Sequence, residues 1–329
     1  MPLEPPSNDP LRRHATVMAA LKNRLSGLCA FVPADKPVMY LDYPVHLNVG
    51  DQLINLGTEA WFSDHAYTVI GRASVLDCTE RDLAKIGPDT TIVLHGGGNF
   101  GDIYDVHQNF REMVVERFPG NKIVVMPQSV HFQSAERLRK AAAIFSRHPD
   151  LTIAVRDRES HTLLTDHFAN PVHLFPDMAH QLWLTEAPSG AHRADDARTL
   201  CLWREDVEGL PYTDQFGLGK VEFRDWESLI TVHDIRVFKA VKRWYGIDRK
   251  LGHRFPNHAA WYAIRRFIVE RMIRLFREQD LIVTNRLHAI ILACLTNIDV
   301  VFADNSYGKL SRYHSAWLDG CRVRPAGGS

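Results

Sequence analysis

Short apolar runs alternate with longer amphipathic segments along most of the chain from Pro37 to residue 186. The apolar runs are rich in β-branched residues and show little polar alternation, which is typical of parallel strands covered by helices on both faces. We expect strands at Val38–Asp42, Tyr67–Ile70, Thr91–Leu94, Ile123–Met126, Thr152–Val155 and Val172–Phe175. We expect helices at Gln52–Asp64, Gln108–Phe118, Ala135–Arg147 and Glu159–Phe168. This order predicts a doubly wound parallel sheet.

A second unit of the same kind follows a small, polar segment at residues 187–196. Its expected strands are Thr199–Trp203, Leu281–Thr284 and Val300–Ala303, with a weaker helical pattern over Glu227–Tyr245. Between the last two strands, apolar residues recur at helical spacing from Leu287 to Leu295. The sequence therefore predicts an α/β protein with two Rossmann-like lobes facing a cleft. The predicted divisions are 1–36 (tail and amphipathic helix), 37–186 (N-terminal lobe) and 187–329 (C-terminal lobe).

Two segments combine apolar spacing with basic residues, Leu11–Leu28 and Trp261–Arg277. Each pattern fits a helix that packs on the protein body, which we favour, and also a helix that contacts an anionic membrane surface. Met1–Pro10 is Pro-rich and acidic, unlike a signal peptide, and no apolar run reaches about 18 residues. We expect a cytoplasmic protein, with peripheral contact at the inner membrane face left open.

Composition narrows the classes of function. Lys plus Arg and Asp plus Glu both number 39, so the basic excess of a nucleic-acid-binding protein is missing. The five cysteines are far apart and form no C-x-x-C pair, which argues against a disulfide framework or a zinc knuckle. The 17 histidines are scattered singly. We predict no nucleic acid partner and no metal.

Polar and glycine-rich clusters follow several of the expected strands, where ligands bind in such sheets. Asn48-Val49-Gly50-Asp51 comes first, and either Asn48 or Asp51 can simply cap the next helix. His95 to Asp102 contains three consecutive glycines and a fourth at Gly101. Glycines here favour a loop whose backbone N–H groups, notably at Gly97 and Gly98, bind an anion or a sugar. The spacing matches neither a dinucleotide fingerprint nor a Walker loop.

Two arginines follow strands further along. Arg156 precedes a predicted helix start and fits either a phosphate or carboxylate ligand or a plain salt bridge. Arg286 and His288 flank the start of the clearest helix in the chain, where backbone N–H groups and the macrodipole favour an anion. Lys309, after the last strand, adds another cation.

Taken in order, these blocks resemble the polysaccharide pyruvyl transferase family, in the branch of bacterial exopolysaccharide synthesis. The resemblance runs from about residue 38 to about residue 315. The matching blocks are Asn48–Asp51, Gly96–Asp102, Pro127-Gln128-Ser129, Arg156–Ser160, Pro176-Asp177, Arg286-Leu287-His288 and Lys309.

The resemblance implies transfer of a pyruvyl group from phosphoenolpyruvate to two hydroxyls of one sugar, forming a ketal, in a fold similar to the two-lobed glycosyltransferase type B arrangement. It further implies a lipid-linked oligosaccharide acceptor and no cofactor beyond the donor. We expect His288 to be the general acid, with Asp102 or Asp51 as the base. The expected donor-binding residues are Arg156, Arg286, Lys309, Asn48, Gly97, Gly98 and Ser129.

Two other functions fit the same blocks. One is a glycosyltransferase of the same two-lobed shape that uses a nucleotide sugar. The other is a non-catalytic sugar-binding subunit of a polysaccharide assembly complex. The first would be stabilised by a nucleotide sugar instead of phosphoenolpyruvate, and the second would tolerate loss of His288.

Overall fold

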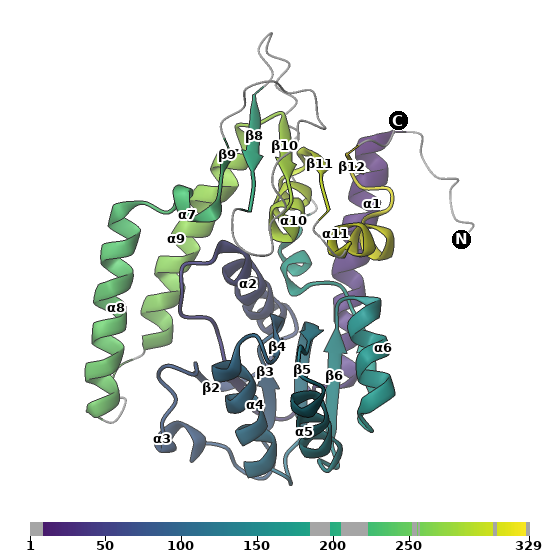
Figure 1. Cartoon of the computed structure of the whole chain (residues 1–329). Coiled ribbons are helices and arrows are strands. Elements are labelled where there is room, and N and C mark those ends of the chain that lie inside the picture. Colours follow the sequence, from purple (N-terminus) through teal and green to yellow (C-terminus); the bar gives the residue numbers. More distant parts are fainter. Residues whose placement is uncertain are drawn as a thin grey trace.

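Two parallel β-sheets form the two lobes of the protein (Figure 1). The computed structural model describes residues 9–184, 198–204, 223–251, 255, 257–304 and 308–326. The N-terminal sheet has the strand order β2-β1-β3-β5-β6-β7, with β4 paired to β5. Its strands are β1 (Val38–Leu41), β2 (Val69–Ala73), β3 (Thr91–Leu94), β4 (Gly97–Gly101), β5 (Ile123–His131), β6 (Leu151–Val155) and β7 (Val172–Leu174). This sheet confirms the predicted doubly wound α/β arrangement.

Side chains alternate between the two faces of the N-terminal sheet and enter different cores. Met39 and Ile92 join a core formed with α3 (Glu80–Leu83), α4 (Asp105–Arg117), α5 (Ala135–Ser146) and α6 (Arg158–His167). Tyr40 and Val93 join a core on the other face, formed with α2 (Val49–Asp64) and the short 3-10 helices η1 (Ser26–Ala30) and η2 (Met178–Leu182). Both faces are covered, which explains the nearly continuous apolar runs in the strands.

The C-terminal sheet is smaller and has the order β12-β11-β10-β8-β9. Its strands are β8 (Thr199–Leu202), β9 (Phe223–Arg224), β10 (Leu281–Thr284), β11 (Asp299–Phe302) and β12 (Val323–Pro325). Its helices are α7 (Trp226–Leu229), α8 (Val232–Lys250), α9 (Asn257–Arg277), α10 (Leu287–Thr296) and α11 (Lys309–Tyr313), followed by η3 (His314–Leu318). The predicted strand Leu281–Thr284 is confirmed residue for residue.

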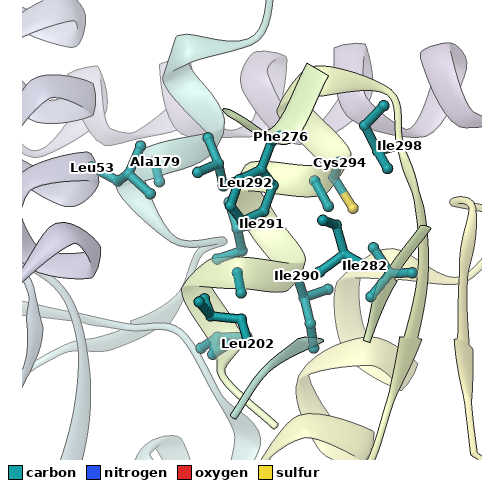
Figure 2. Close-up of a cluster of buried hydrophobic side chains, with 14 of the residues drawn as sticks. Leu53, Ala179, Leu202, Phe276, Ile282, Ile290, Ile291, Leu292, Cys294 and Ile298 are labelled. Carbon is teal, nitrogen blue, oxygen red and sulfur yellow. The ribbon is translucent and has the colours of Figure 1, made fainter. Parts of the chain in front are cut away.

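The core of the C-terminal lobe extends into the N-terminal lobe. Leu53 of α2 and Ala179 of η2 belong to the same buried cluster as Ile291 and Leu292 of α10 (Figure 2). Helix α1 (Pro10–Leu25) also joins the lobes, because Met18 packs in this cluster. Because this apolar area is buried across the junction, the two lobes are held in one relative orientation. Helices α1 and α9 both bury one face, as the packing interpretation expected.

Several boundaries differ from the predicted ones. Strand β2 begins two residues later than expected, at Val69. The glycine segment after β3 was expected to be a loop, but Gly97–Gly101 forms strand β4 and pairs with β5. The predicted lobe boundary at 186/187 falls outside the described residues, and the division into lobes stays a prediction at that point.

Candidate active site

The centre of the site is Arg156, the residue directly after β6. It is 2% exposed, and its Nε donates a hydrogen bond of 2.9 Å to Ser129 Oγ. Its Nη1 donates to the carboxylate of Asp177, the residue that caps η2. Ser129 lies on the neighbouring strand β5 and donates its own proton to Asp157 Oδ2 at 2.6 Å. Arg156 is therefore held in one orientation from two sides.

His288 reaches this arginine from the other lobe. It stands in the first turn of α10, and its Nε2 lies 3.5 Å from both Asp177 Oδ2 and Arg156 Nη1. Its side chain is 16% exposed, whereas that of Asp177 is fully buried. The cluster of Arg156, Asp177 and His288 thus joins the lobes and keeps one edge accessible to a ligand.

Asp177 is the anionic partner in this cluster. Burial alone would raise the pKa of its carboxyl. The charge of Arg156 and the hydrogen bond from His288 outweigh burial and bring the pKa well below its ordinary value. Asp177 is therefore ionised at neutral pH, and it orients both the guanidinium and the imidazole before any substrate arrives.

Gly50 allows the imidazole to come this close. Asn48 caps α2 by accepting a 2.9 Å hydrogen bond from the Gly50 N–H. A Cβ placed on Gly50 would lie 2.4 Å from His288 Nδ1, a distance that atoms in contact do not reach. The predicted Asn48–Asp51 block is thus the start of a helix, and the imidazole of His288, the candidate general acid, packs against it.

The glycine strand β4 borders the same cluster. Gly97 has φ +125°, and a Cβ on Gly98 would lie 3.2 Å from Arg156 Nη2. Gly101 has φ +132°, and a Cβ there would meet His131 O at 1.7 Å. Glycines are needed because the strand both uses positive φ and lies against the backbone of β5. This close pairing explains why the expected loop is a strand.

The two carboxylates proposed as bases lie in different surroundings. Asp51 is in the first turn of α2, next to Gly50, and its Oδ1 would be 3.7 Å from a Cβ on Gly97. Its Oδ2 lies 3.6 Å from His46 Nε2. Asp51 therefore stands between the glycine strand and the histidine helix.

Asp102 instead organises a turn. Its two oxygens accept hydrogen bonds from the backbone N–H groups of Gln133 and Ser134, at 2.8 and 2.7 Å. Burial alone would raise the pKa of Asp102, but these backbone bonds lower it overall. Both oxygens therefore have structural partners.

Arg286 is paired within its own lobe. It occupies the N-cap position of α10, and its Nη2 donates to Asp225 Oδ2, at the start of α7. Its Nε is buried and has no hydrogen-bond partner among the described residues, which leaves a donor for an anion. Lys309 begins α11 after Gly308, which has φ +73°. Residues 305–307, which belong to the same predicted block, lie outside the described residues.

A second buried polar network follows β1. Asp42 has φ +66°, and its Oδ1 lies 2.7 Å from His107 Nδ1. Its Oδ2 lies 3.6 Å from the buried guanidinium of Arg111, which donates to Asn99 Oδ1 at 2.8 Å. Sequence reasoning assigned no role to these residues or to the carboxylates of Asp177 and Asp225. Asp42 could have been noticed, since it is a charged residue at the end of the expected strand Val38–Asp42.

No metal-like cluster accompanies these residues. In the part of the chain that the structure describes, no group of three or more His, Cys, Asp or Glu side chains could hold a metal ion. Among the same residues, no helix is long and apolar enough to cross a bilayer. The positive charge available to a substrate in this region comes from side chains such as Arg156 and Arg286.

Comparison with known proteins identifies the family. The profile of the polysaccharide pyruvyl transferase family matches residues 48–307, which include Asn48, Arg156, Asp177 and His288. The chain belongs to this family. It is thus a pyruvyl transferase family enzyme acting in polysaccharide chemistry.

Individual relatives agree. The chain is 35% identical over 317 residues to a Bacillus subtilis protein named "Putative pyruvyl transferase EpsO", covering 92% of each chain. It is 29% identical over 301 residues to "Pyruvyl transferase 1" of Schizosaccharomyces pombe, covering 88% of this chain and 71% of that protein. A solved structure of a functionally uncharacterised Klebsiella pneumoniae protein superposes with a TM-score of 0.59 at 16% identity, covering 94% of this chain and 98% of that one. This last likeness shows the fold alone.

Proposed function

We propose that this pyruvyl transferase takes its pyruvyl group from phosphoenolpyruvate and forms a ketal on two hydroxyls of a sugar. The observation that carries the proposal is the cluster of Arg156, Asp177 and His288 beside Gly98. Phosphoenolpyruvate carries a phosphate and a carboxylate, so it needs fixed cations at more than one point. Arg156 presents its Nη2 toward Gly98, and Arg286 keeps a buried Nε without a partner in the described residues. Charge-assisted hydrogen bonds to such groups contribute about 1.5–3 kcal/mol each.

The proposed first step is protonation of the donor. His288 gives a proton to the CH2 carbon of the enol, and positive charge develops at the neighbouring carbon, C2. An oxygen of the acceptor sugar forms a bond to C2 while Asp51 accepts the proton of that hydroxyl. Asp177 holds the imidazole in place before the transfer.

The second step releases phosphate. The C2–O bond to phosphate breaks, Arg156 and Arg286 stabilise the leaving group, and the second hydroxyl bonds to C2. The second hydroxyl proton leaves with the phosphate. The net result is one ketal and one inorganic phosphate from one diol and one phosphoenolpyruvate, with no further cofactor and with fixed cations in place of a metal.

We further propose that the acceptor is a sugar of a lipid-linked exopolysaccharide repeat unit. The exposed side chains of Ile103 and Tyr104, which follow β4, remain for this acceptor if the donor occupies the arginine cluster. In this proposal Lys309 completes the donor site. Asn48 positions the helix start, Gly97 the glycine strand and Ser129 the guanidinium of Arg156.

The direct test is incubation of the purified enzyme with phosphoenolpyruvate and lipid-linked repeat units. We expect mass spectrometry to show one pyruvyl ketal added to the acceptor and one phosphate released. Phosphoenolpyruvate should raise the melting temperature, whereas UDP and GDP sugars should not. Protection by a nucleotide sugar alone would contradict the donor assignment. Retention of the ketal in cells that carry His288→Gln would contradict the assigned chemistry.

A further inference from the structure

Exposed apolar side chains gather on the hairpin formed by α8 and α9. Seven of the fourteen large hydrophobic side chains that are exposed in the described residues lie between residues 232 and 267. Trp244, Ile247 and Leu251 follow one another at i, i+3 and i+7, so they share one side of α8 at its carboxyl end. They are 41%, 45% and 50% exposed. The ring of Phe255 lies 5.0 Å from that of Trp244 and extends this apolar tip.

A stripe of positive charge runs along α8 beside the apolar tip. Arg236, Lys239, Arg243 and Lys250 recur at i, i+3, i+7 and i+14, which places them on the outward side of the helix. With Lys242 and Arg249, α8 carries six basic residues, and all six are exposed. None of them forms an ion pair with another residue in the described ranges.

The acidic residues of α8 do not offset this charge at the surface. Asp234 is buried and paired with Arg271 of α9, at 2.5 and 3.1 Å. Asp248 is also buried, and its carboxylate accepts a 2.7 Å hydrogen bond from Asn257 Nδ2. Both carboxylates attach α8 to α9. The outward side of α8 is left cationic in a protein whose formal net charge is zero.

The hairpin is fixed to the N-terminal lobe at the segment between β1 and α2. Trp261 Nε1 donates to Pro44 O at 2.7 Å, and the hydroxyls of Tyr245 and Tyr43 lie 3.3 Å apart. Tyr43 and Pro44 belong to the segment that leads from β1 to the Asn48–Asp51 helix start. Helix α8 stands at the outer side of the molecule, on the left in Figure 1. Its exposed side therefore faces away from the body, while Tyr245 on its buried side contacts the N-terminal lobe.

We propose that α8 and the tip of the α8–α9 hairpin dock the enzyme on an anionic membrane surface. Charge complementarity selects the partner: unpaired Lys and Arg attract anionic lipid headgroups. Trp244, Ile247 and Leu251 at the carboxyl end of α8, with Phe255 just after it, suit the interface between headgroups and acyl chains. A nucleic acid would use the cations but not the aliphatic tip, and a second copy that docked through the same surface would meet the same positive charge. Membrane docking does not depend on the proposed function. Its purpose, to present a lipid-linked acceptor, does rest on that function.

The test is co-sedimentation of the full chain with vesicles, without phosphoenolpyruvate. We expect binding to phosphatidylcholine vesicles that contain about 30% phosphatidylglycerol, and weak binding to phosphatidylcholine alone. Lys239→Gln/Arg243→Gln should lower the partition coefficient about 30-fold, since each cation near the surface contributes about fivefold. Ile247→Ser/Leu251→Ser should lower it at least about tenfold. Higher salt should weaken wild-type binding.

Control variants remove exposed cationic and apolar side chains elsewhere on the surface. Arg139→Gln/Arg147→Gln removes two exposed cations near α5, and Val106→Ser removes an exposed apolar side chain on α4. These variants should bind vesicles like the wild type. The proposal is overturned if the α8 variants bind vesicles as well as the wild type, or if the controls lose as much binding. Circular dichroism and the thermal shift with phosphoenolpyruvate report the fold and donor binding separately. Vesicle binding without pyruvyl transfer would refute the proposed function and leave this inference standing.

Discussion

Two arginines occupy equivalent places in the two lobes and have different surroundings. Arg156 follows β6 and Arg286 follows β10, and each stands at the start of the next helix. Arg156 contacts Asp177 and reaches His288 across the lobe junction. Arg286 pairs with Asp225 within its own lobe. The same order of strand, arginine and helix thus gives a contact between lobes in one case and a local clamp in the other.

The largest expected effect tests this difference directly. Arg156→Leu should lower the free energy of unfolding by about 3–5 kcal/mol, because it leaves the Asp177 carboxylate buried without its counterion. It should also abolish pyruvyl transfer. Urea denaturation and a phosphate-release assay measure the two losses.

Arg286→Leu is the matched control, because it removes the same group from the other lobe. Its ion pair is 15% exposed on each side, against 3% and 0% for Arg156 and Asp177, so the unfolding free energy should fall by less than in Arg156→Leu. Activity should still fall if Arg286 binds the phosphate. Equal losses of stability in the two variants would contradict the contrast drawn between these arginines.

The difference between the two arginines could not be read from the sequence. Strand β10 and helix α10 were predictable, since their apolar spacing is strong and local. The partner of Arg156 is Asp177, 21 residues further along, and the choice between a ligand and a salt bridge depends on that tertiary contact. The sequence offered both roles, and the structure shows the salt bridge already formed.

The next effect concerns the residue from the opposite lobe. His288→Gln keeps a polar side chain of similar reach but removes the proton donor, so the turnover number should fall about 10²–10⁴-fold. The free energy of unfolding should change little, because the imidazole is accessible at one edge. Thermal shift with phosphoenolpyruvate should show that the donor still binds. A variant with near wild-type turnover would remove His288 from the proton transfer.

A smaller effect is expected from the glycine under the imidazole. Gly50→Ala adds a Cβ that would lie 2.4 Å from His288 Nδ1, so the histidine must move. We expect turnover to fall roughly 10–100-fold, since misplacement of a catalytic group by about 1 Å is costly. Gly120→Ala is the control, because a Cβ there has no atom within 4 Å. Kinetics of both variants at saturating phosphoenolpyruvate decide the matter, and equal activities would show that His288 adapts freely.

The glycine strand shows a different limit of sequence reasoning. Four glycines between Gly96 and Gly101 indicated a ligand loop, because positive φ and close approach both need glycine. Gly97 and Gly101 do use positive φ, but the close approach at Gly101 is to the backbone of β5. The glycines indicated the positive φ values correctly. The backbone they allow to approach, however, is that of β5, about 30 residues further along the chain, and not a ligand.

The smallest expected effect separates the two carboxylates that the sequence left equivalent. Asp102 accepts two backbone hydrogen bonds and has a lowered pKa, so its ionised form stabilises the folded state. This contribution is present above the ordinary Asp pKa of about 3.9 and is lost as the pH falls below it. Asp102→Asn should therefore lower the unfolding free energy by about 1 kcal/mol at pH 7, and the difference from the wild type should shrink in acid.

The effect on activity should be the reverse: Asp51→Asn should lower turnover more than Asp102→Asn does. Asp51 stands beside Gly50 and the glycine strand, so Asp51→Asn should lower turnover about 100-fold with little loss of stability. Asp102→Asn should keep most of its turnover at pH 7, because both of its oxygens already have structural partners. Urea denaturation at neutral and acid pH, with transfer rates at pH 7, distinguishes the two. If Asp102→Asn lost turnover and Asp51→Asn did not, the base would belong to the turn at Gln133 and the acceptor would have to enter from that side.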